Sequence, residues 1–264
     1  MTNADLVTAL EETWAGVNDV IAGIDAEQWQ LPTPCEGWTV HDLVAHLGAI
    51  ESQVQGLPQP DIEVPPPTAG IDAWTEAGVA PRRGWTTEAV VDEVAAASSA
   101  QLAHLRALDD EGWGTTRSGP VGDTTEAGLA AIRLLDVWLH LLDLRSALGL
   151  PLEPEREPTA CRLCVDRAVE LAGWGATKKA GLPDGSRVRL ALKHPGKARA
   201  DVVVADGRGS VVPSSGEGGP TVIGTGIAFL LVVAGRPYMA NATGGVRAEG
   251  DAARLLLKGY RIFS

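Results

Sequence analysis

The hydrophobic period of the chain changes near residue 150, and this change restricts the possible folds more than any other feature. Before it, apolar residues recur at intervals of three and four, as Leu6, Leu10 and Trp14 do, which predicts amphipathic helices. After it, short β-branched runs such as RVRLALK and ADVVVADG are separated by Gly, Pro and Asp, which predicts strands. A chain of 264 residues with 45% hydrophobic residues can bury two cores. We therefore expect an α+β protein with a helical domain, residues 1–152, followed by a smaller α+β domain, residues 153–264.

The helical half predicts a four-helix bundle. The first helix ends near residue 23, and the second begins after Thr39, where Asp42 can complete a capping box. A third helix is expected over residues 87–108. The fourth runs from Asp123, with Glu126 completing a second capping box, to residue 149. Helices of this length and number are typical of a bundle.

Proline marks a long connection inside this bundle, and strands dominate the second half of the chain. The segment PQPDIEVPPPTAG, residues 58–70, excludes a helix or a central strand and predicts a crossing loop. Beyond residue 152 we expect a fifth helix over 158–174, then the strands RVRLALK, ADVVVADG and GSVVPSS. Two helical pieces, 227–234 and 251–258, are expected on either side of a strand in GGVRAEG.

The charge of the chain excludes some classes of partner. The formal net charge is −12 and the pI is near 4.8, so a phosphate backbone would be repelled. No run of 18 apolar residues is present, and the start, MTNADLVTALEETW, has no signal-peptide pattern. We therefore expect a cytoplasmic monomer or homodimer with neither a nucleic-acid nor a membrane partner.

The three cysteines fit a reducing compartment rather than a disulfide framework. Cys161 and Cys164 form a C-x-x-C pair, but they lie inside a predicted helix. A redox pair normally lies at a helix N-terminus, and a structural zinc site needs a second pair of ligands. The interpretation we favour is two packing cysteines.

The most informative segment for function is LLDVWLHLLDLR, residues 134–145, in the fourth predicted helix. Asp136 and His140 are one turn apart on the same face, and Arg133 and Asp143 flank them on the helical wheel. The remaining circumference is almost entirely apolar. This narrow ionisable stripe is either a solvated face or the lining of a cleft with metal ligands, supported from behind by Asp143 or Arg145.

A third ligand has to come from another helix, and the second predicted helix supplies a candidate. His46 lies at the edge of its apolar stripe, whereas His41 points away from it and is expected to meet water. His104 on the third predicted helix is a possible fourth ligand but is more typical of a satisfied core or surface histidine, and His194 is expected in a turn. Three N/N/O ligands would leave one coordination position open, which is typical of a catalytic zinc site. Water or a thiol can fill such a position.

Two segments carry a resemblance to a known family. TPCEGWTVHDLVAHL, residues 33–47, and DVWLHLLDLRSALG, residues 136–149, resemble the N-terminal domain of the mycothiol-dependent maleylpyruvate isomerase family, a branch of the DinB-like four-helix bundles. The family pattern is G-W-T-V-x-D-L-x-x-H-L followed later by E-x-W-x-H-x-x-D-x-R. FLLVVAGRP and VRAEGDAARLLL are similar to the family's C-terminal domain, which has a sterol-carrier-like fold.

The resemblance implies roles for individual residues. It places the two metal histidines at His46 and His140, and the carboxylate ligand at Asp136, where the family usually has glutamate. Aspartate is one methylene shorter, so the metal would have to lie closer to the helix. In the family an arginine of the C-terminal domain steadies the carboxylate of the substrate, and Arg236 is the matching candidate here. Arg236 would equally suit a helix end, where a cation is favoured.

The resemblance also implies a chemistry. Zinc, or another divalent metal, would hold the sulfur of mycothiol as a thiolate, which adds to the double bond of an electrophilic small molecule. Elimination after bond rotation gives cis/trans isomerisation, whereas a retained thioether makes the enzyme a mycothiol S-transferase. A second alternative is a non-catalytic binding protein with a degraded metal site, which the aspartate at position 136 keeps open.

Overall fold

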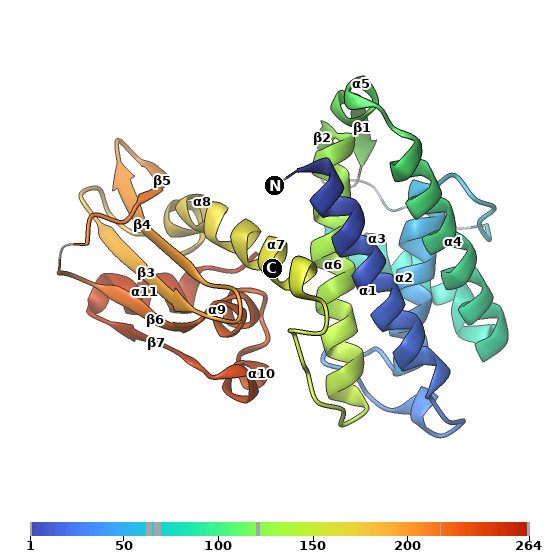
Figure 1. Cartoon of the computed structure of the whole chain (residues 1–264). Helices are drawn as coiled ribbons and strands as arrows, with labels where there is room; N and C mark the ends of the chain where they lie inside the picture. The colour runs from blue at the N-terminus through green and yellow to red at the C-terminus, as the bar shows by residue number, and fades with distance from the viewer. Residues whose placement is uncertain (1, 62–64, 66–69, 120–121, 217, 263–264) are drawn as a thin grey trace. The chain divides into compact units, whose positions relative to one another are not determined.

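The computed structural model describes residues 2–61, 65, 70–119, 122–216 and 218–262. It divides into two compact units, residues 1–151 and 152–264 (Figure 1). The first unit is helical and the second contains a sheet, as an α+β chain requires. Within the described residues, no helix combines the length and the apolarity that a membrane span needs.

Four long helices form the first unit: α1 (Asn3–Ala22), α2 (Val40–Val54), α4 (Thr87–Ala107) and α6 (Glu126–Ala147). Capping boxes start two of them, with Thr2 and Asp5 before α1 and Thr39 and Asp42 before α2. Helix α2 packs on α4 and α6, and α1 packs on α6 and α4. Their shared core consists of fully buried side chains that include Leu10, Trp14, Leu43, Leu47, Trp138 and Leu141.

The prediction that the fourth helix begins at Asp123 is wrong. Residues Gly122–Thr125 form strand β2, which pairs antiparallel with β1 (Thr116–Gly119), and α6 begins only at Glu126. Thr125 is the N-cap, and its side chain accepts a hydrogen bond from the Gly128 amide. Glu126 therefore completes no capping box with Asp123.

Shorter elements connect the long helices: η1 (Gln28–Gln30), α3 (Ile71–Val79), η3 (Ala80–Gly84) and α5 (Asp110–Gly114). No pattern in the sequence predicted any of these four elements. In the predicted proline-rich loop, the described positions 58–61, 65 and 70 belong to no helix or strand, and the remaining positions lie outside the described residues.

The second unit is built on a five-stranded sheet in the order β5 (Arg208–Pro213), β4 (Ala198–Ala205), β3 (Arg187–Lys193), β6 (Thr221–Thr225), β7 (Val246–Glu249). Strands β3 and β6 are parallel, and the other neighbours are antiparallel. Strand β6 is the one the sequence analysis missed. It is short and contains Gly224, where a Cβ atom would collide with the Gly245 carbonyl.

Helices complete this unit: α7 (Pro158–Glu170), α8 (Ala172–Trp174), the π-turn η4 (Gly175–Lys179), α9 (Gly226–Val233), α10 (Pro237–Ala240), η5 (Asn241–Thr243) and α11 (Asp251–Gly259). Tyr260, which is fully buried, donates a hydrogen bond to the Ala168 carbonyl at 2.8 Å. Cys161 and Cys164 are buried inside α7 and are not disulfide-bonded, as packing cysteines would be. Burial raises the pKa of Cys161 to about 12 and that of Cys164 well above its ordinary value.

One buried carboxylate in this sheet has a closed set of partners. Asp201 on β4 is fully buried and accepts hydrogen bonds from Arg187 (2.7 Å), the Ser214 hydroxyl (2.9 Å), and the amide and hydroxyl of Ser215 (3.1 and 3.0 Å). Burial alone would raise the pKa of Asp201, but these hydrogen bonds outweigh it and hold the pKa well below its usual range.

Candidate metal centre

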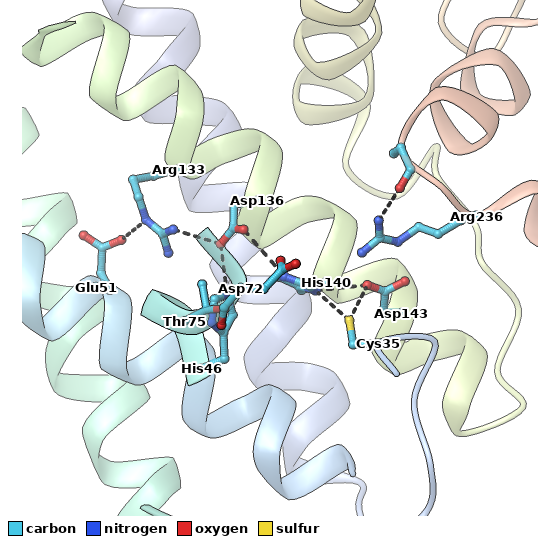
Figure 2. A network of polar contacts seen from close by, with 11 residues as sticks. Cys35, His46, Glu51, Asp72, Thr75, Arg133, Asp136, His140, Asp143 and Arg236 are labelled. Atoms are coloured by element: carbon cyan, nitrogen blue, oxygen red, sulfur yellow. Dashed lines mark hydrogen bonds and ion pairs between the residues drawn. The ribbon is translucent and has the colours of Figure 1, made fainter. Parts of the chain in front are cut away.

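Helices α2 and α6 bring three donor side chains together. His46 comes from α2, and Asp136 and His140 come from α6, one turn apart. His46 Nε2 lies 3.4 Å from Asp136 Oδ2, and His140 Nε2 lies 3.5 Å from Asp136 Oδ1. One potential ligand atom from each residue lies within 4.8 Å of the others. Figure 2 shows the three side chains converging between the two helices.

His46 is the least satisfied side chain of the cluster. It is 2% exposed, and in the part of the chain that the structure describes neither of its ring nitrogens has a hydrogen-bond partner. Its ring packs edge-on against His140 and tilts over Trp38, with centroid distances of 4.9 and 5.0 Å. Burial lowers the pKa of His46 despite the nearby Asp136 carboxylate. The imidazole is therefore neutral, which is the form that binds metals.

His140 is held from behind by a carboxylate. Its Nδ1 lies 3.0 Å from Oδ2 of the fully buried Asp143, so Nδ1 carries the proton that is donated and Nε2 is directed toward Asp136. Of the two residues considered as support for the stripe, the structure gives this contact to Asp143. Burial alone would lower the pKa of His140, but the Asp136 charge and the hydrogen bonds to Asp136 and Asp143 outweigh it and raise the pKa well above its usual value.

Asp136 is fixed by a buried ion pair. Arg133 Nη1 donates to Asp136 Oδ2 at 2.8 Å, and Arg133 Nε donates to Glu51 Oε2 at 3.1 Å (Figure 2). Burial would raise the pKa of Asp136, but the Arg133 charge and His140 hold it well below its usual range. The Asp136 side chain is 20% exposed, while Arg133, Glu51 and Asp143 are buried. The stripe on α6 therefore lines a buried cluster and is no solvated face.

The other histidines lie elsewhere. The prediction that His41 meets water is wrong: it is buried, its Nε2 lies 3.2 Å from the Trp85 carbonyl, and its ring packs against Trp29. His104 pairs with Glu126 at 3.0 Å, and His194 is exposed and pairs with Glu155 at 2.7 Å. These contacts satisfy all three residues without a ligand.

Arg236 belongs to the second unit, where it is the N-cap of α10. Its Nη1 donates to the Ala234 carbonyl at 2.7 Å, so the guanidinium binds the end of the preceding helix α9. This is the helix-end contact that a cation is expected to make.

Cys35 is the residue of the cluster that the sequence analysis missed. It lies four positions before Thr39, and its half-buried Sγ is 3.6 Å from Asp143 Oδ2 and 3.8 Å from His140 Nδ1. Its position in TPCEGWTV beside the capping box was a signal for proximity to α2, but spacing alone does not show that this loop reaches α6.

Comparison with known proteins identifies the family and the fold. The family model of the mycothiol maleylpyruvate isomerase N-terminal domain matches residues 10–145. Two crystal structures of the mycothiol-dependent maleylpyruvate isomerase, one of them of a mutant, have TM-scores of 0.65 and 0.63 over 96% of both chains, at 16% identity. The helical unit and the sheet-containing unit therefore occur together in a known fold.

Two curated relatives come from Mycobacterium tuberculosis, and both are uncharacterized proteins. One is 28% identical over 150 residues, which is 57% of this chain and 71% of the relative. The other is 29% identical over 149 residues, which is 50% of this chain and 51% of the relative. The family model spans more than half of the sequence, from α1 to the end of the ionisable stripe on α6. This chain therefore belongs to the mycothiol maleylpyruvate isomerase N-terminal domain family.

Proposed function

We propose that this protein is a metal-dependent enzyme in which a low-molecular-weight thiol, mycothiol, attacks an electrophilic small molecule. The observation that carries the proposal is the buried, neutral His46: neither of its nitrogens has a hydrogen-bond partner among the described residues, although Nε2 lies 3.4 Å from Asp136 Oδ2 and faces His140. A buried polar group without a partner costs about 1–3 kcal/mol, so a protein retains one where a ligand satisfies it.

The donor set fits a divalent metal. Ligands of a tetrahedral zinc ion, at bond lengths of about 2.0–2.1 Å, are separated by about 3.3–3.5 Å. His46 Nε2 lies 3.4 Å from Asp136 Oδ2 and His140 Nε2 lies 3.5 Å from Asp136 Oδ1, so each histidine nitrogen is at about this separation from a different oxygen of the carboxylate. The shorter aspartate side chain therefore still reaches both histidines, which favours a working ligand over a degraded site. We propose His46, Asp136 and His140 as the metal ligands and zinc as the metal.

The surrounding residues orient the three proposed ligands and set their protonation states. When bound, the metal supplies an open coordination position at which a thiol is held as the thiolate. Asp143 accepts a hydrogen bond from His140 Nδ1–H and so presents Nε2 as a ligand. Arg133, anchored by Glu51, holds the Asp136 carboxylate and balances part of its charge. Burial keeps His46 neutral.

The outcome of the attack defines the enzyme class. Addition of the thiolate to an activated double bond, rotation, and elimination of the same thiolate give cis/trans isomerisation, as the name of the structural neighbours suggests. If the thioether is kept, the same first step gives a mycothiol S-transferase. We propose Arg236 as the cation that binds the carboxylate of the substrate.

Metal content and thiol dependence test the proposal. The wild-type protein should bind one metal ion through the histidine cluster, and His46→Ala should lose it, while His194→Ala, a histidine substitution at an exposed position, should not. Metal-loaded protein should consume or isomerise unsaturated acids with mycothiol and not without a thiol. Product analysis separates isomer from thioether. Metal content that is the same in His46→Ala as in the wild type would favour the non-catalytic binding protein instead.

A further inference from the structure

The two ring nitrogens of His140 face two different sets of donors. Nε2 faces Asp136 and His46, which form the proposed catalytic position. Nδ1 faces Asp143 Oδ2 at 3.0 Å and Cys35 Sγ at 3.8 Å, and these two atoms are 3.6 Å apart. Sulfur, nitrogen and oxygen donors thus surround a second point on the opposite side of the same imidazole (Figure 2).

From this geometry we infer that Cys35, His140 Nδ1 and Asp143 form a second cation position, which takes a thiophilic divalent ion such as Zn²⁺ or Cd²⁺. The three separations agree with one ion shared by all three atoms. At zinc bond lengths of about 2.3 Å to sulfur and about 2.0–2.1 Å to nitrogen and oxygen, they correspond to ligand angles of about 95°, 110° and 120°. These values are scattered around the tetrahedral angle, so the side chains need to move little.

Without an ion, the contacts of the Cys35 thiol in this cluster are weak, whereas His140 and Asp143 share a 3.0 Å hydrogen bond. A thiol is a poor hydrogen-bond donor, and contacts of 3.6 and 3.8 Å are long even for sulfur. Replacing the thiol proton by an ion therefore gives up little bonding at Cys35, and the bonds from the ion to His140 Nδ1 and Asp143 have to replace the hydrogen bond between these two residues. Cys35 is also the half-buried cysteine of the chain, whereas Cys161 and Cys164 are buried inside α7 of the other unit. An ion from solvent reaches the thiol at Cys35 first.

Filling the second position involves proton loss but no redox step. The Sγ proton of Cys35 and the Nδ1 proton of His140 leave to solvent, and when both positions are filled the Nε2 proton leaves as well, so that His140, as an imidazolate, carries one ion on each nitrogen. An ion at Nδ1 takes the place of the hydrogen bond that Asp143 accepts from His140. Excess thiophilic metal therefore changes the donor properties of a proposed catalytic ligand.

Cadmium titration of the full chain tests the inference, with Cys35→Ser as the matched variant. By equilibrium dialysis, the wild type should bind one Cd²⁺ more than Cys35→Ser, and the extra ion should bring an ultraviolet sulfur-to-cadmium charge-transfer band. Cys161 and Cys164 are present in both proteins, so the difference reports on Cys35. Equal stoichiometry and equal bands in the two proteins would overturn the inference.

His46→Ala separates this inference from the proposed function. That variant should lose the catalytic position and keep the charge-transfer band, because Cys35, Asp143 and Nδ1 are unchanged. If the wild type binds a single Cd²⁺ with the band and His46→Ala loses both, then Cys35 belongs to the first position and the second does not exist. If His46→Ala binds as much metal as the wild type and Cys35→Ser binds less, the proposed catalytic position fails and the second position stands.

Discussion

The two units each bury a carboxylate among cationic and polar neighbours. The two environments differ in how many of their buried polar groups are hydrogen-bonded. Asp201 in the second unit accepts four hydrogen bonds from Arg187, Ser214 and Ser215. Asp136 in the first unit accepts from Arg133, while its neighbour His46 has no hydrogen-bond partner in the described part of the chain. Both carboxylates have lowered pKa values and are charged at neutral pH.

The difference separates a structural carboxylate from a proposed ligand. A network whose groups are mostly paired stabilises the fold by itself, whereas buried nitrogens without partners destabilise it until something binds. Arg189 Nε, 3.7 Å from Asp201 Oδ1, is the one loose contact of the Asp201 network among the described residues. At the Asp136 cluster, the buried atoms without a hydrogen-bond partner among the described residues are His46 Nδ1, His46 Nε2 and Arg133 Nη2. We therefore expect the two sites to respond in opposite ways to metal and to mutation.

The largest expected effect is that of metal removal. Chelation of the bound ion should lower the free energy of unfolding by about 4 kcal/mol relative to protein with free metal at about 1,000 times Kd. Calorimetry with and without chelator measures the change. Asp201→Asn should show the same loss on chelation, because the Asp201 site does not use the ion. If chelation leaves the unfolding curve of the wild type unchanged, then the Asp136 cluster does not differ from the Asp201 site in binding a stabilising ion.

The second-largest expected effect is the loss of stability when the hydrogen bonds to Asp201 are weakened. Asp201→Asn leaves Arg187 and the two serines with a poorer acceptor in a buried position and should destabilise the protein by about 2–3 kcal/mol in denaturant unfolding. Metal affinity should stay at the wild-type value. A fall in metal affinity in Asp201→Asn would show that the two sites are coupled.

A smaller effect, on metal affinity, is expected when Asp143, which accepts a hydrogen bond from His140, is replaced. Asp143→Asn should weaken metal binding about 10–100-fold, because the amide no longer fixes His140 with Nε2 as the ligand. Competition with a chromophoric chelator gives the affinity. Glu11→Gln, at an exposed pair with Arg106, is the matched carboxylate control and should bind as the wild type does. An unchanged affinity in Asp143→Asn would remove Asp143 from the proposed site.

The smallest effect concerns pH. Because the pKa of Asp201 is lowered in the folded protein, the unfolded chain binds its proton first, and stability falls as the pH drops below the unfolded value of about 4. The stability difference between wild type and Asp201→Asn, measured in metal-free protein, should therefore be constant from pH 7 to about pH 5 and narrow toward pH 3. A difference that widens on acidification would contradict the assignment.

The sequence predicted those parts of the site that follow from local rules. The capping box at Thr39 and Asp42 sets the start of α2, and helical spacing then places His46, while Asp136 and His140 share a face of α6. Contacts that depend on the path of a loop to a residue distant in sequence could not be predicted. Cys35 reaches Asp143 across 108 positions of sequence, and His41 is covered by Trp29 and the Trp85 carbonyl. Hydrophobic periodicity therefore predicts neither the contact of Cys35 nor that of His41.

The same limit explains the errors in the fold. The hairpin β1–β2 replaced the predicted start of α6 because strand pairing between residues 116–119 and 122–125 competes with helical capping signals. Strand β6 was missed because a short segment with a glycine has little strand signal of its own and is stabilised by its neighbours β3 and β7.

The pairing of His46 on α2 with Asp136 and His140 on α6 has a topological consequence. An ion held by these side chains would join positions about 90 residues apart in the folded chain, and because it binds the folded state and not the unfolded one, its binding free energy adds to the free energy of unfolding. Because α6 is the last long helix of its unit, the cross-link can close only after nearly the whole unit has been synthesised. Metal uptake would then report the completion of folding.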